Sequence, residues 1–174
     1  KALIIDTTGP TISSVSSTKA NAAYKVGESI PINVNFDDKV YVTGTPQLTL
    51  ETGTADAVVD YSSGSESTTL TFNYTVASTH NSSDLDYTST SALALNSGTV
   101  KDSLGNVATL TLPAPGTTGS LGANKAIQLL AAKDKSGYPG LFFSLSEGHA
   151  DTVKAYMDGI LNLLQEKPLT ADQA

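Results

Sequence analysis

The sequence predicts a mainly β fold, an antiparallel β-sandwich followed by a short α-helical segment. The clearest observation is Thr69–Val76, in which apolar and polar residues alternate strictly. This period of two is typical of a strand with one buried side and one solvent-facing side. Similar short segments recur with turn signals between them, at intervals of roughly 8–15 residues, as in all-β sandwiches. No segment before Ala126 has apolar residues at helical spacing.

The same alternation predicts the individual strands. In chain order they are Ala2–Ile5, Thr11–Ser16, Ile30–Phe36, Val40–Val42, Pro46–Glu51, Ala57–Tyr61, Thr69–Val76, a segment holding Leu93 and Leu95, and Leu110–Leu112. Loops or turns are expected at Lys19–Gly27, Asp37–Lys39, Ser62–Ser67, Asn81–Asp86, Asp102–Asn106 and Pro113–Gly122. Tyr87 fits either a tyrosine corner, in which the hydroxyl bonds back to the backbone at a turn, or an ordinary half-buried tyrosine.

From about Ala126 the alternation is lost and the pattern becomes helical. Apolar residues recur at spacings of three and four between Val153 and Leu164, which is typical of an amphipathic helix that ends before Pro168. We therefore expect a domain boundary at about residue 128. The expected parts are an end strand at 1–5, the sandwich at 6–127 and a helical tail at 128–174.

Composition excludes several classes of function. The formal net charge is −7, with ten Lys and no Arg, which argues against binding to nucleic acid. No run of about 18 apolar residues is present, so we expect no membrane insertion. The chain has no Cys and therefore no disulfide, thiol nucleophile or Cys-ligated zinc. It also has no initiating Met, and we expect it to be part of a longer protein.

The residue types that carry catalysis form no recognisable constellation. His80 lies in a polar turn and is expected to be solvated, and His149 is expected to hold a turn by hydrogen bonding. Asp84 and Asp86 could imitate a glycosidase pair, but closely spaced carboxylates in a turn are usually turn formers. No Gly-x-Ser-x-Gly elbow or Gly-rich phosphate loop occurs. We expect that the protein is not an enzyme.

Several separated motifs resemble the tandem immunoglobulin-like domains of large bacterial surface adhesins. They are Asp6-Thr7-Thr8-Gly9-Pro10, Gly44-Thr45-Pro46, Leu104-Gly105-Asn106 and Gly119–Ile127. The resemblance covers about residues 1–127 and implies an immunoglobulin-like sandwich, an extracellular or bacterial cell-surface location, and neighbouring immunoglobulin-like repeats as partners. Lys1-Ala2-Leu3 also recurs as Lys125-Ala126-Ile127, so the resemblance implies that Lys1–Ile5 is the last strand of a preceding repeat or its remnant.

The tail resembles a different family. Asp134–Leu164 is similar to a single ankyrin repeat, and Gly148-His149-Ala150-Asp151-Thr152-Val153 resembles the turn into its second helix. One such repeat cannot bury its own apolar face, because ankyrin repeats are stable only when stacked. We therefore expect the tail to cover the sandwich, a second copy, or further repeats. Similar single repeats occur in secreted effectors of pathogenic bacteria.

Five oxygen-bearing residues form the only candidate metal site that the sequence offers. In immunoglobulin strand order they gather at one end of the sandwich: Asp6, Asp37, Asp38, Asp102 and Asn106. Calcium takes six to eight hard oxygen ligands, and the resemblance implies calcium as a common stiffening device at domain junctions. The same residues are also good turn formers. Both interpretations, a calcium site and simple turns, remain open at this point.

The leading functional hypothesis is a non-enzymatic structural or adhesive module, a spacer from a repetitive bacterial surface or secreted protein. A spacer should have its two ends at opposite poles, about 40 Å apart. The alternative is a protein- or glycan-binding module that uses the helical tail or the Ser62–Ser67 loop, in a secreted effector or a fusion of unrelated parts. Its candidate contacts would be exposed tyrosines, at Tyr41, Tyr61 or Tyr138.

Overall fold

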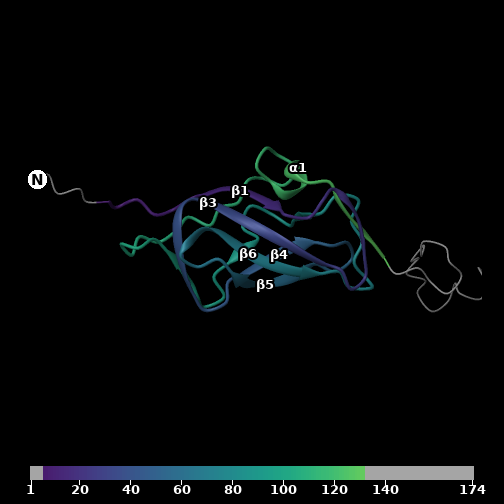
Figure 1. The fold of residues 1–174 in the computed structure, drawn as a ribbon, viewed down its shortest axis with the longest axis horizontal. Coiled ribbons are helices and arrows are strands. Elements are labelled where there is room, and N and C mark those ends of the chain that lie inside the picture. Colours follow the sequence, from purple (N-terminus) through teal and green to yellow (C-terminus); the bar gives the residue numbers. More distant parts are fainter. Residues whose placement is uncertain (1–5, 132–174) are drawn as a thin grey trace, which may run out of the picture. The chain divides into compact units, whose positions relative to one another are not determined.

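A computed structural model describes residues 6–131 (Figure 1). The chain divides into two units, residues 1–139 and 140–174, and the described residues belong to the first. This part has a mainly β, sandwich-like fold that is consistent with an immunoglobulin-like domain, as the sequence predicted. The predicted first strand, the ankyrin-like segment and its helix, His149 and Tyr138 lie outside the described residues.

The described residues form ten strands and one short helix. Their bounds are β1 Ile12–Ser17, β2 Ala22–Lys25, β3 Ser29–Thr43, β4 Gln47–Glu51, β5 Ala57–Ser63, β6 Ser67–Thr75, β7 Asp86–Tyr87, β8 Leu93–Ala94, β9 Thr99–Lys101, α1 Leu121–Asn124 and β10 Ile127–Leu130. No helix among residues 6–131 is long and apolar enough to cross a membrane.

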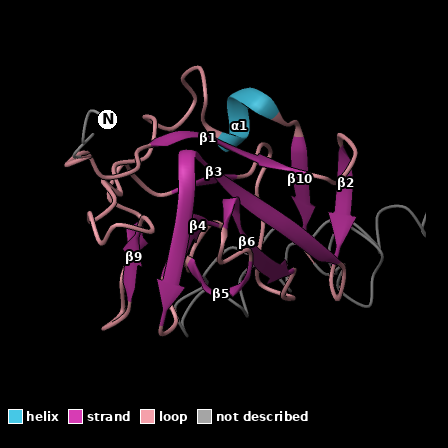
Figure 2. Cartoon of the chain, turned by 60° about the vertical axis from the view of Figure 1, so that its left-hand side comes forward, coloured by secondary structure: helices cyan, strands magenta, loops and turns pink. Residues whose placement is uncertain are grey.

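Strand β5 connects the two faces of the sandwich. Hydrogen bonding runs through the order β1-β3-β6-β5-β4-β7, with β8 paired to β4 and β9 paired to β3. The first part of β5 pairs antiparallel with β4, from Ala57 to Asp60, whereas Tyr61 and Ser63 pair with β6. Strands β10 and β2 form a separate parallel pair (Figure 2). Because β5 changes its partner along its length, β4 and β6 pair with different parts of β5 and can separate from each other.

The alternating residues of β3, β4 and β6 fill the core between the faces. Ile32 of β3 lies opposite Phe72 of β6, and both side chains are fully buried. Burial alternates along β6 as the period of two predicts, and a buried Phe or Ile side chain contributes about 1.5–3 kcal/mol. The remaining fully or nearly buried members include Ile30, Val34, Leu48, Leu50, Leu70 and Tyr74. The sequence therefore predicted the central part of the sandwich correctly.

The turn predicted at Asp37–Lys39 is wrong, because β3 continues through it from Ser29 to Thr43. The register with β6 shifts between Asn35 and Val40, so the three charged residues occupy an irregularity within one long strand. Bulges of this kind accommodate extra residues without ending the strand. The charged side chains are exposed there, and Val40 directly after them is buried.

Three further segments differ from the predictions. Ala22–Lys25, expected as loop, is strand β2, because its partner β10 comes from the far end of the chain. Leu110–Leu112, expected as a strand, is irregular, although Leu112 is buried and its N–H donates to Thr90. Leu121–Asn124 forms a single helical turn capped by Ser120, whose side chain accepts from the N–H of Ala123. Each outcome depends on a long-range partner or a cap that periodicity does not reveal.

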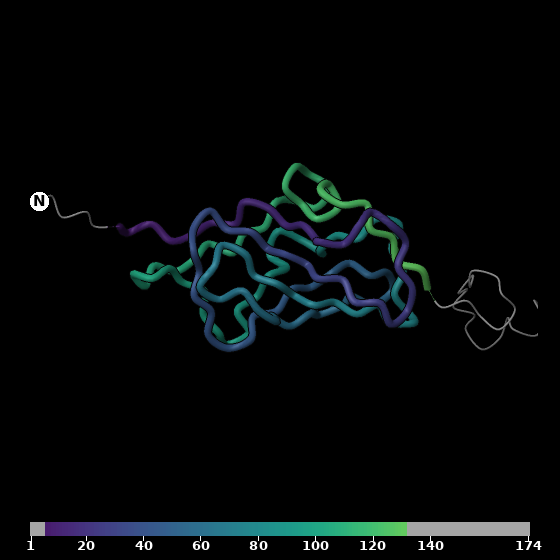
Figure 3. The backbone as a smooth tube through the Cα atoms, viewed as in Figure 1, coloured from purple at the N-terminus to yellow at the C-terminus, as the bar shows by residue number. Residues whose placement is uncertain are grey.

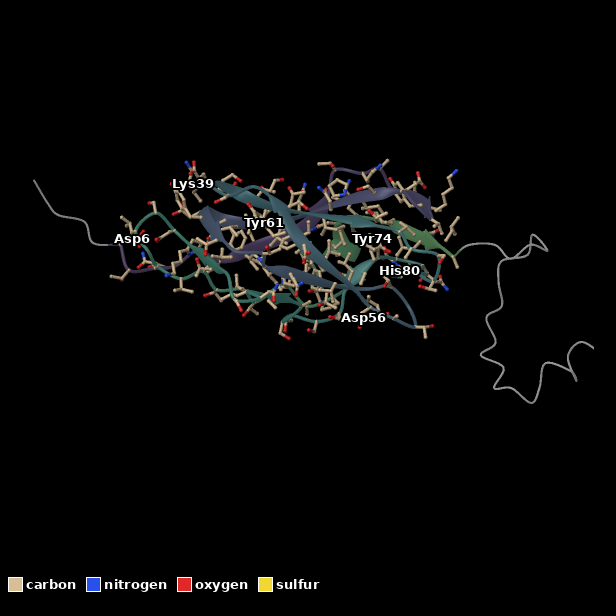
Figure 4. The ribbon with its side chains drawn as sticks, turned by 90° about the horizontal axis from the view of Figure 1, so that it is seen from below. Asp6, Lys39, Asp56, Tyr61, Tyr74 and His80 are labelled. Carbon is tan, nitrogen blue, oxygen red and sulfur yellow. The ribbon has the colours of Figure 1, made fainter. Side chains whose placement is uncertain are left out.

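The sandwich extends past the boundary expected at about residue 128. Ile127 and Leu129 are buried and alternate with exposed Gln128 and Leu130. Burial in β10 therefore has a period of two, although three of its four residues are apolar and the sequence does not alternate there. The chain enters the sandwich at one end, where Asp6 lies, and leaves β10 at the opposite end (Figures 3 and 4). We call these the proximal end and the distal end.

Candidate functional site

The turn at Asp102–Asn106 forms the proximal end together with the incoming chain. The carboxylate of Asp102 accepts hydrogen bonds from the N–H groups of Leu104 and Asn106, both at 2.8 Å. The side-chain amide of Asn106 donates to the other Asp102 oxygen at 2.7 Å and to the Asp6 carbonyl at 3.3 Å. Asp6 in turn accepts from the N–H of Thr8 through its own carboxylate. The turn therefore holds the incoming chain in place through the hydrogen bond between Asn106 and Asp6.

The other predicted metal ligands make separate, local contacts. Asp37 accepts from the N–H of Thr11 at 2.7 Å and from the Thr11 hydroxyl at 2.6 Å. Asp38 accepts from the N–H of Lys39, and Figure 4 places Lys39 toward the same end as Asp6. The structure thus gathers the five predicted residues at one end but divides them into separate hydrogen-bonded groups.

As arranged, these residues do not fit a calcium ion. Among residues 6–131 there is no group of three or more Asp, Glu, His or Cys placed to hold a metal. Asn106 directs its N–H₂ group, not its carbonyl oxygen, at Asp102 and Asp6. Calcium would need six to eight oxygens, and both Asp102 oxygens already accept hydrogen bonds. The arrangement favours the turn-forming interpretation, and calcium binding stays a prediction for experiment.

The hydrogen bonds at this end also favour the ionised carboxylates. The hydroxyl and the N–H of Thr11 lower the pKa of Asp37. Burial opposes ionisation of Asp102, but the hydrogen bonds from Asn106, Leu104 and Gly105 outweigh it and lower the pKa of Asp102. A carboxylate that accepts several N–H groups behaves in this way.

A groove opens toward the distal end, where β5 and β6 diverge. Its volume is about 420 Å³. The lining comes from β5, β6 and the following loop and consists of Ala57, Val58, Val59, Asp60, Ser62, Asn73, Tyr74, Thr75 and His80. Where the groove meets the paired part of β5 and β6, the Ser62 hydroxyl accepts from the N–H of Asn73. A side chain thus replaces a backbone carbonyl as the acceptor for this N–H group of β6. Figure 4 shows Tyr74 and His80 on this part of the molecule.

His80 is half-buried in this groove, so the prediction of a solvated histidine is wrong. Its Nδ1 lies 2.7 Å from the Tyr74 hydroxyl and accepts from the N–H of Ala77 at 3.3 Å, and the two rings stack with centroids 5.6 Å apart. Because a backbone N–H can only donate, Nδ1 carries no proton and the neutral ring is protonated at Nε2. Burial lowers the pKa of His80 and raises that of Tyr74 to about 12.

Tyr87 joins distant segments and is not a tyrosine corner. Its side chain is 1% exposed, and its hydroxyl donates at 2.6 Å to the carbonyl of Pro113, which lies far downstream and not at the local turn. Burial, followed by the charge of Asp86, raises the pKa of Tyr87. Asp86 also accepts from the N–H of Gly116, so both residues fix the Pro113–Gly119 segment. Sequence offered no signal for this long-range partner.

The tyrosines suggested as ligand contacts are partly buried where the structure describes them. Tyr61 packs edge-on against Phe72, with ring centroids 6.2 Å apart, and its hydroxyl accepts from the N–H of Ser65. Tyr41 is half-buried on β3. Half of the Ser62–Ser67 segment belongs to the ends of β5 and β6, which leaves a tight turn at residues 64–66. Neither tyrosine presents a freely exposed ring.

Comparisons with known proteins give no family assignment. No family model, no curated protein sequence and no solved structure matches the chain. The conclusions on function therefore depend on the geometry of residues 6–131 and on the sequence motifs.

Proposed function

We propose that residues 6–131 form a non-enzymatic spacer domain, an immunoglobulin-like module of a repetitive bacterial surface or secreted protein. Its partners would be neighbouring immunoglobulin-like repeats, at an extracellular or cell-surface location. The observation that carries the proposal is that the chain enters and leaves at opposite ends (Figures 1 and 3). A module placed in series between two others needs this arrangement.

The incoming segment is held firmly to the body of the domain. The N–H of Thr109 donates to the carbonyl of Pro10 at 2.8 Å, and Thr11 forms a parallel bridge with Thr109. Pro10 is buried, and Gly9 lies so close to the Val107 carbonyl that a Cβ there would overlap it. Together with the Asn106–Asp6 contact, these interactions would transmit the orientation of a preceding module to this one.

The outgoing segment is held by a pairing suited to tension. Strand β10 runs parallel to β2, with Ile127 opposite Ala22 and Leu130 opposite Lys25. Pulling on the end of β10 and on the incoming chain loads the two strands from opposite ends. The hydrogen bonds between parallel strands then bear the load together in shear instead of opening one by one. This geometry supports a role in which the domain carries force between its ends.

A distance measurement between the two ends tests the proposal. The chain has no native Cys, so Thr7→Cys and Gln128→Cys in the full chain give two unique sites for spin labels. We expect one narrow distance distribution on the order of 40 Å, the length of a ten-residue strand with its loops. A broad distribution, or a mean below about 20 Å, would show that the ends are mobile or adjacent and would refute the spacer function.

Binding of a protein or glycan ligand through the ankyrin-like tail stays a prediction. The tail lies outside the described residues, as does Tyr138, and the other two proposed contacts, Tyr41 and Tyr61, are partly buried. The spacer function therefore has the stronger support.

A further inference from the structure

His80 connects the groove to the segment that fixes the last strand. The loop that contains it, residues 77–83, begins directly after Val76 and ends close to β10. Within this loop the N–H of His80 donates to the carbonyl of Ala77 and the N–H of Asn81 donates to Thr52. Two hydrogen bonds then join Ser82 and Leu129, with Leu129 N–H donating to Ser82 at 2.8 Å. Movement of the loop would therefore disturb β10.

The ring of His80 holds the beginning of this loop only while Nδ1 is an acceptor. The Ala77 N–H donates to that nitrogen, and while Nδ1 carries no proton the Tyr74 hydroxyl, 2.7 Å away, must also be the donor of its contact. Protonation would place a hydrogen on Nδ1, so that it faces the Ala77 N–H as a second donor. The Tyr74 hydroxyl could rotate and accept, but the backbone N–H cannot. One of the two contacts is necessarily lost.

The titratable side chains that line the groove with His80 are Tyr74 on β6 and Asp60 on β5. Tyr74 stays neutral well above neutral pH, because burial raises its pKa to about 12. One oxygen of Asp60 accepts from the side-chain amide of Gln47 at 2.8 Å. Asp60 is the carboxylate among the residues that line this groove. Two states of the ring follow, one neutral and bound to Tyr74 and Ala77, the other cationic and without the Ala77 contact.

We propose that His80 is an acid-sensitive latch that holds strand β10 in place at neutral pH and loosens it on acidification. The latch acts at the distal end, where the chain leaves the sandwich. It does not depend on the spacer function, since the contacts that form it lie within this domain.

The sign and size of the effect follow from the two states of the ring. The latched ring has a lowered pKa because it is buried, whereas the released ring titrates near its ordinary value of about 6.5. At pH 5.5, one unit below that value, protonation favours the released state by up to about tenfold relative to pH 7.5. Above pH 7 the ring is neutral in both states, and the latch is closed.

Amide hydrogen exchange followed by NMR on the full chain tests this proposal. The Leu129 amide reports on the latch because it donates to Ser82, and the Phe72 amide in the β3–β6 ladder serves as the internal reference. After correction for the intrinsic rate, we expect protection of Leu129 to fall by up to about tenfold between pH 7.5 and 5.5, with protection of Phe72 nearly constant. Equal protection of Leu129 at both pH values would overturn the proposal.

Two variants identify the titrating group. His80→Asn keeps an acceptor close to the position of Nδ1 but has no ionisable ring, so protection of Leu129 should become independent of pH. His149→Asn removes the other histidine of the chain and should leave the fall unchanged. If His80→Asn retains the fall, or His149→Asn abolishes it, the latch is not His80.

A measurement on the unaltered chain covers the case in which His80→Asn does not fold. The ¹⁵N shifts of the His80 ring give its tautomer and its titration midpoint directly. We expect a proton on Nε2 alone at pH 7.5, and a ring midpoint below the ordinary histidine value, because burial lowers the pKa of the latched ring. A proton on Nδ1 at pH 7.5, or a ring midpoint at or above the ordinary value, would contradict the proposal.

Discussion

Replacement of Tyr87 by Phe tests the long-range contact that holds the Pro113–Gly119 segment. The change removes one hydroxyl from a side chain that is 1% exposed and that donates at 2.6 Å to the Pro113 carbonyl. Loss of a neutral hydrogen bond costs about 1 kcal/mol net, and leaving a partly buried carbonyl without its donor adds roughly 0.5–1 kcal/mol. We therefore expect the free energy of unfolding to fall by about 1.5–2 kcal/mol. For a domain of this size that is about a 5 °C lower melting temperature.

Urea denaturation of the full chain at pH 7.5, followed by tyrosine fluorescence, measures this difference. The matched control is Tyr41→Phe, since Tyr41 is half-buried and its hydroxyl has no hydrogen-bond partner among the described residues. The control should change the stability by less than about 0.5 kcal/mol. If Tyr87→Phe costs no more than Tyr41→Phe, the hydroxyl does not hold the segment and the reasoning fails.

Three further predictions concern the proximal end. Gly9→Ala should lower the free energy of unfolding by about 1–3 kcal/mol, because the added Cβ overlaps the Val107 carbonyl. The control Thr8→Ala should cost under about 0.5 kcal/mol in the same urea titration. Equal effects of the two changes would show that Gly9 does not pack against Val107. Addition of calcium or a chelator should leave the melting temperature unchanged, because the Asp102 oxygens already accept hydrogen bonds; a rise of several degrees with calcium would establish the metal site instead. Thr11→Val should raise the pKa of Asp37 toward its ordinary value, as followed by carbonyl ¹³C shifts. Because the folded-state pKa of Asp37 is lowered, its contribution to stability is present above the ordinary pKa and lost as pH falls through the folded value. The stability of the Thr11→Val variant should therefore depend less on pH in this acidic range. An unchanged Asp37 titration would show that the Thr11 hydroxyl does not lower the pKa of Asp37.

The sequence predicted the core strands because their burial follows a local period. Thr69–Val76 alternates without interruption, and β6 is the result. Predictions from the local sequence pattern were wrong where pairing with a distant segment determines the secondary structure. Ala22–Lys25 has little alternation of its own and becomes a strand only by pairing with Ile127–Leu130. The charged Asp37–Lys39 segment resembles a turn locally, but β3 continues through it, because the strand is paired with β1 and β6 before this segment and with β6 and β9 after it.

The candidate site shows the same division. Strand order was enough to place Asp6, Asp102 and Asn106 together, and the contact between Asn106 and Asp6 fits that prediction. Sequence could not tell whether the carboxylates face an ion or backbone N–H groups, because this depends on the turn geometry around Asp102. His80 was misjudged because its polar neighbours suggest solvent, while the Tyr74 ring that buries it lies on the preceding strand.

Mechanical unfolding tests the spacer function most directly. Handles attached at Thr7→Cys and Ala131→Cys in the full chain would pull the domain from its two ends at pH 7.5. We expect a single unfolding event, because the β10–β2 pair is loaded in shear, with release of roughly 120 residues and a length gain of about 400 Å. If β10 instead peels away at low force as a separate first step, the domain does not carry load between its ends and the proposed function is wrong.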